Sequence, residues 1–339
     1  MPPRRPTQRD IAERAGVSTA TVSYVLSGRR GGAKPLPETR ERVLRAVKEI
    51  GYQLDQAGRS LRRQRTDVVA LMYPAPSSPW SDRLAEQLQV AAGERGLAVV
   101  ALPVAASTPT QAILRVLRQR YIDGAVLLPD SPLAAPELAA LAEQGLSLVV
   151  FDDDLVPDGF DVVRQDRERA CRAAVERLVA AGHRRVAYLA HDGESVDAPE
   201  RTVKLRSYST ALAAHGITLE PGLVLPVADS RSDAYAAVRD LLRGPQPPTA
   251  LVSATDRAAV DAIWAAREIG MRVPEDLAVI GIGNIPEGLM ISPSLTTVGA
   301  PRLDFSREVD RLFARLDAAA PLPGEELSAA WELIVRESG

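Results

Sequence analysis

The feature that most constrains the fold is a regular alternation that begins at Asp67. Short apolar runs alternate with longer stretches whose apolar residues recur at helical spacing. The expected strands are Val68–Met72, Leu97–Leu102, Gly124–Leu128, Ser147–Phe151, Arg185–Ala190, Thr249–Ser253 and Leu277–Ile282. The expected helices are about Ser81–Arg95, Thr110–Arg120, Pro136–Gln144, Arg167–Ala181, Arg201–His215, Asp233–Arg243 and Asp256–Ile269. This order predicts an α/β fold with parallel sheets covered on both faces.

The alternating region is long for a single sheet. The chain has 339 residues, and roughly 150 residues per domain corresponds to about two to three domains. Two doubly wound lobes fit better than one sheet, and such lobes bind ligands beyond the carboxyl ends of their strands. We therefore expect a ligand cleft between two lobes.

Composition excludes several classes of protein. Hydrophobic residues make up 46% and charged residues 25%, which is close to the average of soluble globular proteins. A run of about 18 apolar residues, as a membrane span requires, does not occur, and the polar N-terminus lacks the apolar stretch of a secretory signal. One cysteine, Cys171, excludes an internal disulfide, and the three histidines have no metal-ligand spacing. A cytoplasmic protein without a bound metal is the expectation.

Charge is divided unevenly along the chain. Residues 1–65 hold 15 Lys and Arg against 6 Asp and Glu, a net +9, whereas the remainder carries a net −12. This asymmetry indicates a head that binds a polyanion on an acidic body. A basic tail without a partner is the alternative.

The basic head has the pattern of three short helices. Thr7 is a plausible N-cap of the first, Gly16 supplies a turn, and Ser18 is a plausible N-cap of the second. Gly28 ends the second helix, and a third is expected at about Pro37–Ile50. Two short helices joined at a glycine are typical of a helix-turn-helix, whose second helix enters the DNA major groove. Small three-helix domains that do not bind DNA remain an alternative.

Several separate motifs resemble one family. They are Asp10-Ile11-Ala12, Ala15-Gly16-Val17-Ser18, Thr21-Val22-Ser23, Leu26-Ser27-Gly28, Thr39-Arg40-Glu41-Arg42-Val43 and Gly51-Tyr52. In this order they are similar to the LacI/GalR family of bacterial transcription regulators. The resemblance implies an N-terminal all-α helix-turn-helix head, a hinge helix, and a two-lobed periplasmic-binding-protein-like effector domain.

The resemblance also implies which residues of the head contact DNA. They are Thr7, Gln8, Ser18, Thr19, Ala20, Ser23 and Tyr24. Thr19, Ala20 and Tyr24 occupy the base-reading positions, but relatives often carry Arg where this chain has Tyr24. Because a tyrosine hydroxyl does not form the bidentate contact that arginine makes with guanine, the operator should differ from those of better-known relatives. Leu36 stands where a Ser or Thr usually caps the third helix, so that hydroxyl is lost.

Residues 53–66 form the expected hinge. On composition alone they are typical of a flexible charged linker, but the resemblance implies a short helix that folds on DNA and inserts Leu61 into the minor groove. The expected DNA-binding residues of the hinge are Asp55, Gly58, Arg59, Leu61 and Arg62. Gly58 replaces a common alanine at a cost of about 1 kcal/mol of helix stability. Replacing Gly58 with alanine should raise or preserve operator affinity.

The body contains further landmarks of the family: Gly182-His183-Arg184-Arg185-Val186, Val273-Pro274-Glu275-Asp276 and Pro293-Ser294-Leu295-Thr296-Thr297-Val298. The implied domains are residues 1–52 for the DNA-binding head, 53–66 for the hinge, and 67–339 for effector binding and dimerisation. By the resemblance the chain crosses between lobes near residues 163, 293 and 325. Lobe one is then about 67–163 plus 294–324, and lobe two about 164–292 plus 325–339.

The resemblance, applied to one position at a time, also implies a set of effector-binding residues. They are Pro79, Trp80, Asp152, Lys204, Thr255, Asp256, Gly283 and Asn284. Trp80 is expected either to stack on a ligand ring or to pack between lobe and hinge. Asp152 is expected either to accept hydrogen bonds from ligand hydroxyls or to lie in a solvated loop. The effector itself is a small molecule of unknown identity.

The candidate effector site departs from the family at several positions. Lys204 stands where Arg is common, Thr255 where Asn is common, and Gly283-Asn284 where the family has an Asp-rich pair. Lysine is a point charge without the forked geometry of arginine. We therefore do not expect a simple hexose as the ligand. An anionic ligand drawn to Lys204, or no small ligand, are the alternatives.

These observations lead to one main interpretation. The chain is expected to be a sequence-specific DNA-binding regulator, a repressor that binds a near-palindromic operator as a homodimer under the control of an effector. It is expected to be cytoplasmic and associated with the nucleoid, with no cofactor and no membrane partner. A solute-binding protein for a transporter is the alternative. Enzyme function is disfavoured. Gly281-Ile282-Gly283 is a G-x-G motif without the continuation of a phosphate-binding loop, and it is better explained as a tight turn after a strand. Phosphate-loop and nucleophile motifs are absent from the sequence.

Overall fold

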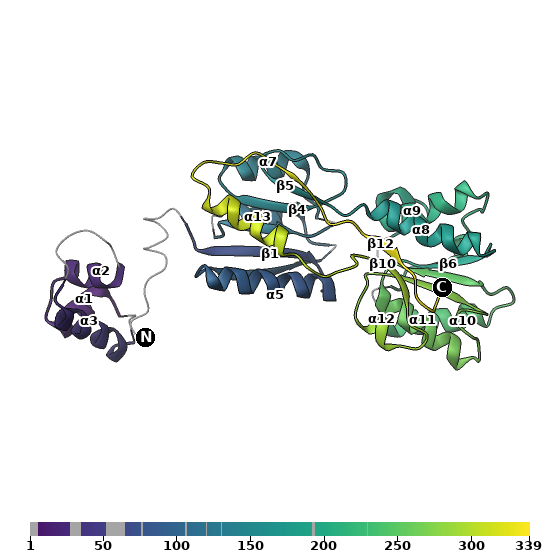
Figure 1. Ribbon diagram of the computed structural model, residues 1–339, viewed down its shortest axis with the longest axis horizontal. Coiled ribbons are helices and arrows are strands. Elements are labelled where there is room, and N and C mark those ends of the chain that lie inside the picture. Colours follow the sequence, from purple (N-terminus) through teal and green to yellow (C-terminus); the bar gives the residue numbers. More distant parts are fainter. Residues whose placement is uncertain are drawn as a thin grey trace. The chain divides into compact units, whose positions relative to one another are not determined.

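The computed structural model of the protein describes residues 6–27, 35–51, 65–75, 77–105, 107–119, 121–129, 131–191, 194–228 and 230–339. The chain divides into two compact units, Met1–Thr66 and Asp67–Gly339, called here the head and the body (Figure 1). Within the described ranges, no helix combines the length and the apolar character that crossing a bilayer requires.

The described part of the head consists of α1 (Gln8–Ala15), α2 (Thr19–Ser27) and α3 (Pro37–Glu49). One apolar cluster holds these helices together. Its buried members are Ile11, Ala12, Ala15, Val22, Val43 and Ala46. Their spacing of three and four residues within each helix places them on one helical face. The three helices that the sequence predicts are therefore confirmed.

Capping explains where the head helices begin and end. The Thr7 side chain accepts a hydrogen bond from the Asp10 backbone N–H, and the Asp10 carboxylate accepts one from the Thr7 backbone N–H. Gly16 ends α1 in the left-handed region at φ 63°, a conformation that glycine adopts without strain. At α3 the capping position is held by Leu36, which makes no side-chain cap and is 71% exposed.

The body contains two six-stranded sheets, and lobe one is built on the first. Its strand order is β11-β5-β4-β3-β1-β2. The strands are β1 (Val68–Pro74), β2 (Ala98–Val104), β3 (Gly124–Leu127), β4 (Ser147–Phe151), β5 (Asp161–Arg164) and β11 (Glu326–Ser328). The helices between and after them are α5 (Pro79–Glu94), α6 (Thr110–Arg118), α7 (Ala135–Glu143) and α13 (Ser306–Asp317).

Lobe two is built on the second sheet, with the order β12-β10-β9-β8-β6-β7. Its strands are β6 (Val186–Leu189), β7 (Val224–Leu225), β8 (Ala250–Ser253), β9 (Ala278–Ile282), β10 (Thr296–Gly299) and β12 (Glu332–Ile334). Its helices are α8 (Arg167–Ala180), η1 (Pro199–Arg201), α9 (Val203–Ala214), η2 (Pro221–Leu223), α10 (Arg231–Leu242), α11 (Asp256–Glu268) and α12 (Glu287–Met290). Figure 1 shows α8 and α9 on one side of this sheet and α10 and α11 on the other.

The apolar runs in the middle of each sheet become strands because both faces of the sheet are buried there. In β1, Val69 and Leu71 belong to the apolar cluster with α5 and α13, whereas Ala70 and Met72 belong to the cluster with α6 and α7. Side chains alternate between the faces of a strand, so a strand covered on both sides must be apolar at every position. All strand pairs are parallel except β10 with β12. The predicted α/β fold class with two parallel-sheet lobes is confirmed.

The chain crosses between lobes three times, and two crossings differ from the prediction. The first lies near residue 165, close to the predicted 163. The second lies after Gly299 instead of near 293, because β10 pairs with β9 in lobe two. The third lies after Ser328 instead of near 325, because β11 pairs with β5 in lobe one. These two short strands have no apolar run of their own, so the sequence pattern did not reveal them.

The first and third crossings lie side by side. The Ala329 backbone N–H donates to the Arg164 carbonyl at 2.8 Å, and the Trp331 N–H donates to the Gln165 carbonyl at 2.7 Å. These bonds continue the pairing of β5 with β11 beyond the sheet. The two crossings therefore form a short ribbon between the lobes.

Candidate functional site

The predicted DNA-contacting residues of the head lie at the N-terminus of α1, just before α2 and along α2. Ser18, Thr19 and Ala20 are exposed, whereas Val22 on the same helix is fully buried. The side of α2 that carries these three residues is therefore free of the head's own core. Small side chains at the N-terminal end of a recognition helix allow its backbone to come close to base edges.

Other candidates in the head have internal roles. The Thr7 hydroxyl is 2.8 Å from an Asp10 carboxylate oxygen, within the cap of α1. The Ser18 hydroxyl accepts from the Thr21 N–H at 3.2 Å, as the predicted cap of α2 would. Gln8, Ser23 and Tyr24 are half-buried. The hinge candidates Asp55, Gly58, Arg59, Leu61 and Arg62 lie outside the described residues.

At the edge of lobe one, Pro79 and Trp80 open α5 behind the cap Ser78. Trp80 is 8% exposed and packs edge to face against Phe151 and Phe305, with ring centroids 5.1 and 4.9 Å away. Of the two expected roles, the structure supports packing, although the second partner is a residue of the second crossing and not of the hinge.

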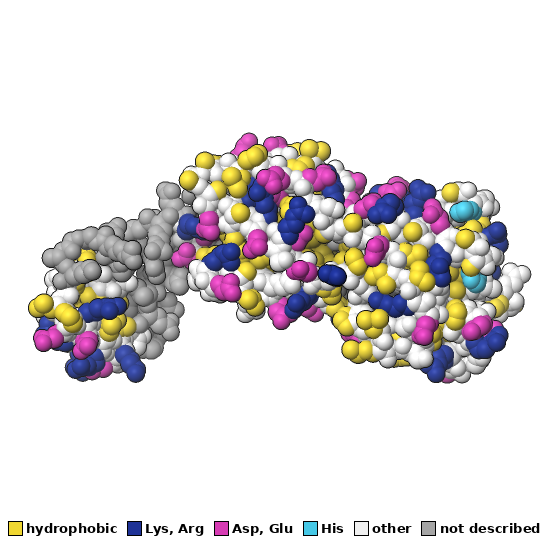
Figure 2. Space-filling model, in the orientation of Figure 1, with side chains coloured by type: hydrophobic (Ala, Val, Ile, Leu, Met, Phe, Trp, Pro, Cys, Tyr) yellow, Lys and Arg dark blue, Asp and Glu magenta, His cyan; other side chains and the backbone are white. Residues whose placement is uncertain are grey.

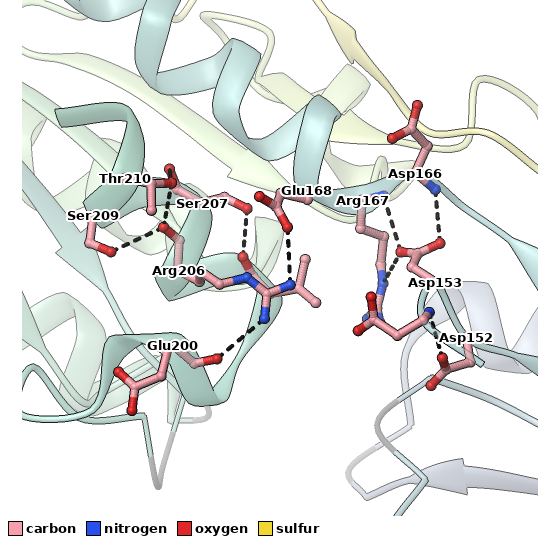
Figure 3. A network of polar contacts seen from close by, with 12 residues as sticks. Asp152, Asp153, Asp166, Arg167, Glu168, Glu200, Arg206, Ser207, Ser209 and Thr210 are labelled. Atoms are coloured by element: carbon pink, nitrogen blue, oxygen red, sulfur yellow. Dashed lines mark hydrogen bonds and ion pairs between the residues drawn. The ribbon is translucent and has the colours of Figure 1, made fainter. Parts of the chain in front are cut away.

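Asp152 and its neighbour Asp153 follow β4 and have different roles (Figure 3). Oδ1 of Asp152 accepts the backbone N–H groups of Asp154 and Leu155 at 2.7 and 2.8 Å, which forms a local turn. Asp153 reaches across to lobe two: its carboxylate accepts the backbone N–H groups of Gln165, Asp166 and Arg167.

Asp153 also pairs with the Arg167 side chain, whose Nε is 3.2 Å from Oδ2. The carboxylate therefore caps α8 from the other lobe, because Asp166 has φ 55° and makes no side-chain cap of its own. Burial raises the pKa of Asp153, but the backbone N–H groups and the charge of Arg167 together lower it below its ordinary value. The ionised form is the one that holds the first crossing.

Figure 3 shows the same network continuing within lobe two. Arg206 on α9 donates to the Glu168 carboxylate on α8 at 3.0 Å and to the Glu200 carbonyl at 3.2 Å. The first turn of α8 is thus tied to lobe one through Asp153 and to α9 through Arg206. Any movement between lobes that changes the position of α8 must act on this network.

Lys204 is on α9 of lobe two, and its ammonium group has partners within that lobe. Nζ donates to the Ala254 carbonyl at 2.8 Å and lies 2.9 Å from Nε2 of His191. Glu194, which is buried, accepts the backbone N–H of His191 at 2.8 Å and the Thr202 hydroxyl at 2.5 Å. The contacts of Lys204 are internal, so the expectation of an anion drawn to this lysine has no support from its geometry.

Thr255 and Asp256 organise the start of α11. The Thr255 hydroxyl caps the helix and donates to the Ala228 carbonyl at 3.1 Å. Asp256 is fully buried and accepts the Thr297 hydroxyl at 2.6 Å and the Ile285 N–H at 2.8 Å. Burial raises its pKa to about 6, against the opposing effect of these hydrogen bonds. Both residues therefore join strands and loops of lobe two.

Gly283 and Asn284 turn the chain after β9. Gly283 has φ 140°, and a Cβ added at Gly281, two residues earlier, would lie 2.1 Å from Oδ1 of Asp256. Asn284 donates through Nδ2 to the Ala300 carbonyl at 2.8 Å and accepts from Arg336 at 2.6 Å. The amide of Asn284 thus fastens the second crossing.

Two surface hollows lie away from the junction of the lobes. One is lined by residues of α9 and the loop after it, and the other by Gln111, Arg115, Arg118 and Gln119 on and just after α6. Among the described residues, no three His, Cys, Asp or Glu side chains are grouped as a metal site would require. Figure 2 shows Lys and Arg interspersed with Asp and Glu over the visible face of the body.

Sequence reasoning missed Asp153, Gln165 and Trp331, which lie at the crossings, and His191, which follows β6 of lobe two. Asp153 is the middle residue of the run Asp152-Asp153-Asp154, in which only Asp152 was considered, either as a ligand contact or as part of a solvated loop. Gln165 and Trp331 lie in crossings without regular structure, where no periodicity marks them. A usable signal was the start of the helix at Arg167. The first backbone N–H groups of that helix need hydrogen-bond acceptors, and a carboxylate of the aspartate run that follows the strand Ser147–Phe151 could have supplied them.

Comparison with known proteins identifies both units. The family "Bacterial regulatory proteins, lacI family" matches residues 7–55, and "Periplasmic binding protein-like domain" matches residues 175–339. The HTH-type transcriptional regulator CelR of Thermobifida fusca is 33% identical over 99% of both chains. The HTH-type transcriptional repressor CytR of Escherichia coli K12 is 30% identical over 89% of this chain and 87% of its own. A solved transcriptional regulator CelR–cellobiose complex, 32% identical, covers 99% of this chain and 100% of its own with a TM-score of 0.63.

Proposed function

Because the chain belongs to the LacI family of bacterial regulatory proteins, we propose that it is a repressor whose dimer binds a near-palindromic operator and responds to a small effector held between the lobes. As a member of this family it is a DNA-binding transcription regulator and not an enzyme. The observation that carries the proposal is the exposed N-terminal end of α2 on a packed helix-turn-helix head. A solute-binding role would leave that head without a purpose.

Electrostatics supports DNA binding by the head. Residues 1–65 carry a net +9, whereas the visible face of the body mixes both signs (Figure 2). Phosphate neutralisation by Lys and Arg supplies most of the non-specific affinity for DNA, and base contacts supply specificity. Thr19, Ala20 and Tyr24 are the proposed base-reading residues. The proposed location is the cytoplasm, in association with the nucleoid, because the target is chromosomal DNA.

Exposed apolar residues support a homodimer formed through the body. Strand β2 is the edge of its sheet, and Val100 on it is 41% exposed. Val90 on α5, Trp264 on α11 and Met290 on α12 are also exposed. An uncovered strand edge and exposed large apolar side chains are typical of a surface that another chain covers. A two-fold dimer would present two α2 helices to two half-sites.

The effector is proposed to act at the junction of the lobes. There the carboxyl ends of β4, β6, β8 and β9 bring Asp153, His191, Thr255 and Asn284 to the edges of the two sheets. The solved CelR complex contains cellobiose. Because the present chain is similar to CelR, this supports a small polar ligand for it as well. Whether the effector weakens or strengthens operator binding follows from which lobe arrangement it favours.

Selection of bound duplexes from a random pool tests the proposal with the full-length protein. We expect enrichment of a near-palindromic site, and affinity that falls as salt rises, with a log–log slope of about −0.9 for each neutralised phosphate. Ala20→Glu, on the exposed end of α2, should weaken specific binding more than tenfold by repelling phosphate. Ala213→Glu, on an exposed position of α9, is the matched control and should not change it.

The contrary result is equally clear. If the full-length protein shows no preference for any selected duplex over bulk competitor DNA at moderate ionic strength, the proposed function is wrong. Equal binding by Ala20→Glu and the control would remove α2 as the recognition helix.

A further inference from the structure

The side chains of α2 lack the groups that most recognition helices use to read bases. None of the nine residues of this helix is Arg, Lys, His, Asn, Gln, Asp or Glu. Arginine and lysine recognise guanine, asparagine and glutamine form bidentate bonds with adenine, and carboxylates accept from cytosine. Helix α2 therefore has no side chain that can make a bidentate or charged contact with a base edge.

The N-terminal end of α2 presents methyl groups. Oγ of Ser18 lies 2.9 Å from Oγ1 of Thr21 and accepts the Thr21 backbone N–H at 3.2 Å, so both hydroxyls belong to the cap of the helix. Thr19 and Ala20 lie between these two residues and are exposed. The groups that face outward here are therefore the methyl groups of Thr19 and Ala20 and one threonine hydroxyl.

The next turn of the helix adds little discrimination. Ser23 and Tyr24 are half-buried, and each carries a single hydroxyl. A hydroxyl both donates and accepts, so it can bond to any of the four bases. Val22 is fully buried in the head's core and fixes which side of α2 faces outward. The choice between bases thus falls on the methyl groups of Thr19 and Ala20.

Thymine is the base that matches such a surface. In the major groove it presents a 5-methyl group, which cytosine lacks, whereas the purines present polar edges. Contact between two methyl groups removes both from water. For one methyl group this is worth about fourfold in affinity, the equivalent of about 0.8 kcal/mol.

We propose that Thr19 and Ala20 select thymine through its 5-methyl group, so that each operator half-site has A·T pairs where the N-terminal end of α2 enters the major groove. This inference rests on the proposed function and names the bases that its recognition helix reads. Phosphate contacts by the basic head supply the affinity. A bidentate contact discriminates by about five- to 150-fold per base pair, so α2 discriminates less sharply, by about fourfold.

Chemical substitution in the operator tests the proposal with the full-length protein. In the duplex that selection yields, thymines are replaced by deoxyuridine, one symmetric pair at a time. Deoxyuridine lacks only the 5-methyl group and keeps the minor-groove edge, so contacts made from that groove are unchanged. We expect at least one symmetric pair at which binding weakens about fourfold per half-site, or about 16-fold for both together.

A second substitution separates the methyl group from the hydrogen-bonding edge. At the sensitive position, cytosine paired with guanine should bind more weakly than thymine paired with adenine. Because 5-methylcytosine carries its methyl group at the same place as thymine, it should bind about fourfold more tightly per half-site than cytosine.

Variants assign the methyl contact to a residue. Ala20→Gly and Thr19→Ser each remove one methyl group, and in the variant that has lost the contact the thymine and deoxyuridine duplexes should bind equally. Thr19→Val keeps the methyl group without the hydroxyl and should retain the deoxyuridine effect. Ala213→Gly on α9 is the matched control and should also retain it. Since each variant is compared with itself on two duplexes, a general loss of helix stability cancels.

Two outcomes overturn the proposal. One is a selected operator in which no thymine loses more than about twofold in affinity on replacement by deoxyuridine. The other is a deoxyuridine effect that persists in full in both Ala20→Gly and Thr19→Ser. Either result would leave the proposed DNA binding standing, because a preferred duplex has then been found. Failure to select any duplex would instead count against the proposed function.

Discussion

Asp153 of lobe one caps helix α8 of lobe two, and its Oδ2 lies 3.2 Å from both the backbone N and the Nε of Arg167. The Arg167 side chain is 7% and the Asp153 side chain 15% exposed. A helix whose N-terminus is capped from another lobe keeps a fixed point as the lobes move. The first crossing is therefore a pivot, and larger displacements are expected at positions farther from it.

Asp153→Asn should lower the free energy of unfolding by about 2 kcal/mol, because Arg167 would remain buried without its counter-ion. Chemical denaturation measures this. Since the pKa of Asp153 is lowered in the folded protein, its contribution is present above the unfolded pKa of about 3.9 and is lost as pH falls through the folded value. Asp152→Asn, whose oxygen can still accept its two N–H groups, is the control. Equal losses in both variants would contradict the capping role.

Asp256 predicts the opposite pH dependence. Its pKa is raised to about 6 by burial, so its protonated form is favoured in the folded state. The resulting stability is full below the unfolded pKa and is lost as pH rises through about 6. Relative to Asp256→Asn, the free energy of unfolding should fall by about 2 kcal/mol between pH 4.5 and 7.5. A difference that is constant over this range would show that Asp256 does not titrate there.

Leu36→Ser should stabilise the head. The capping position of α3 holds an exposed leucine without a cap bond, and a serine there should contribute about 1 kcal/mol. Hydrogen exchange of α3 in the full-length protein measures the gain. Leu36→Ala removes the leucine without adding a hydroxyl, so equal protection in both variants would speak against capping.

Arg257 connects the lobes at a second place. Its Nη1 donates to the Ser77 carbonyl at 3.2 Å, from α11 to the loop before α5. Arg257→Met should part the lobes and raise the radius of gyration in small-angle scattering, with a loss of about 1 kcal/mol in stability. Arg267→Met removes a similar bond, from Arg267 to the Ser292 carbonyl within lobe two. An equal change in both variants would mean that Arg257 does not hold the lobes together.

The sequence pattern predicted those helices and strands whose own residues show the periodicity of a helix or the apolar run of a buried strand. The run Val68–Met72 and the amphipathic stretches after it could only be buried strands and covering helices, and these are β1 and its neighbours. Strands β11 and β12 have three residues each. Their pairing depends on partners more than 30 residues away, and local periodicity does not carry that information.

The candidate site was predicted less well, for a physical reason. The family resemblance identified positions at the ends of strands. Adjacent residues at such a position point in different directions, however, and the resemblance does not show which of them reaches the other lobe. Asp152 closes a turn while Asp153 reaches the other lobe. Likewise, Thr255 and Asp256 have the polar character of a ligand site but are used in capping and in joining strands.

The three crossings have a consequence for biosynthesis. The first sheet lacks its strand Glu326–Ser328 until the elements of lobe two from Arg167 to Gly299 have been synthesised, and the helix Ser306–Asp317 that covers one of its faces is also made after them. During translation the first lobe must therefore wait, partly uncovered, while nearly all of the second is made. Nascent chains of this protein should depend on chaperones at that stage, since exposed apolar surface and an open sheet favour aggregation.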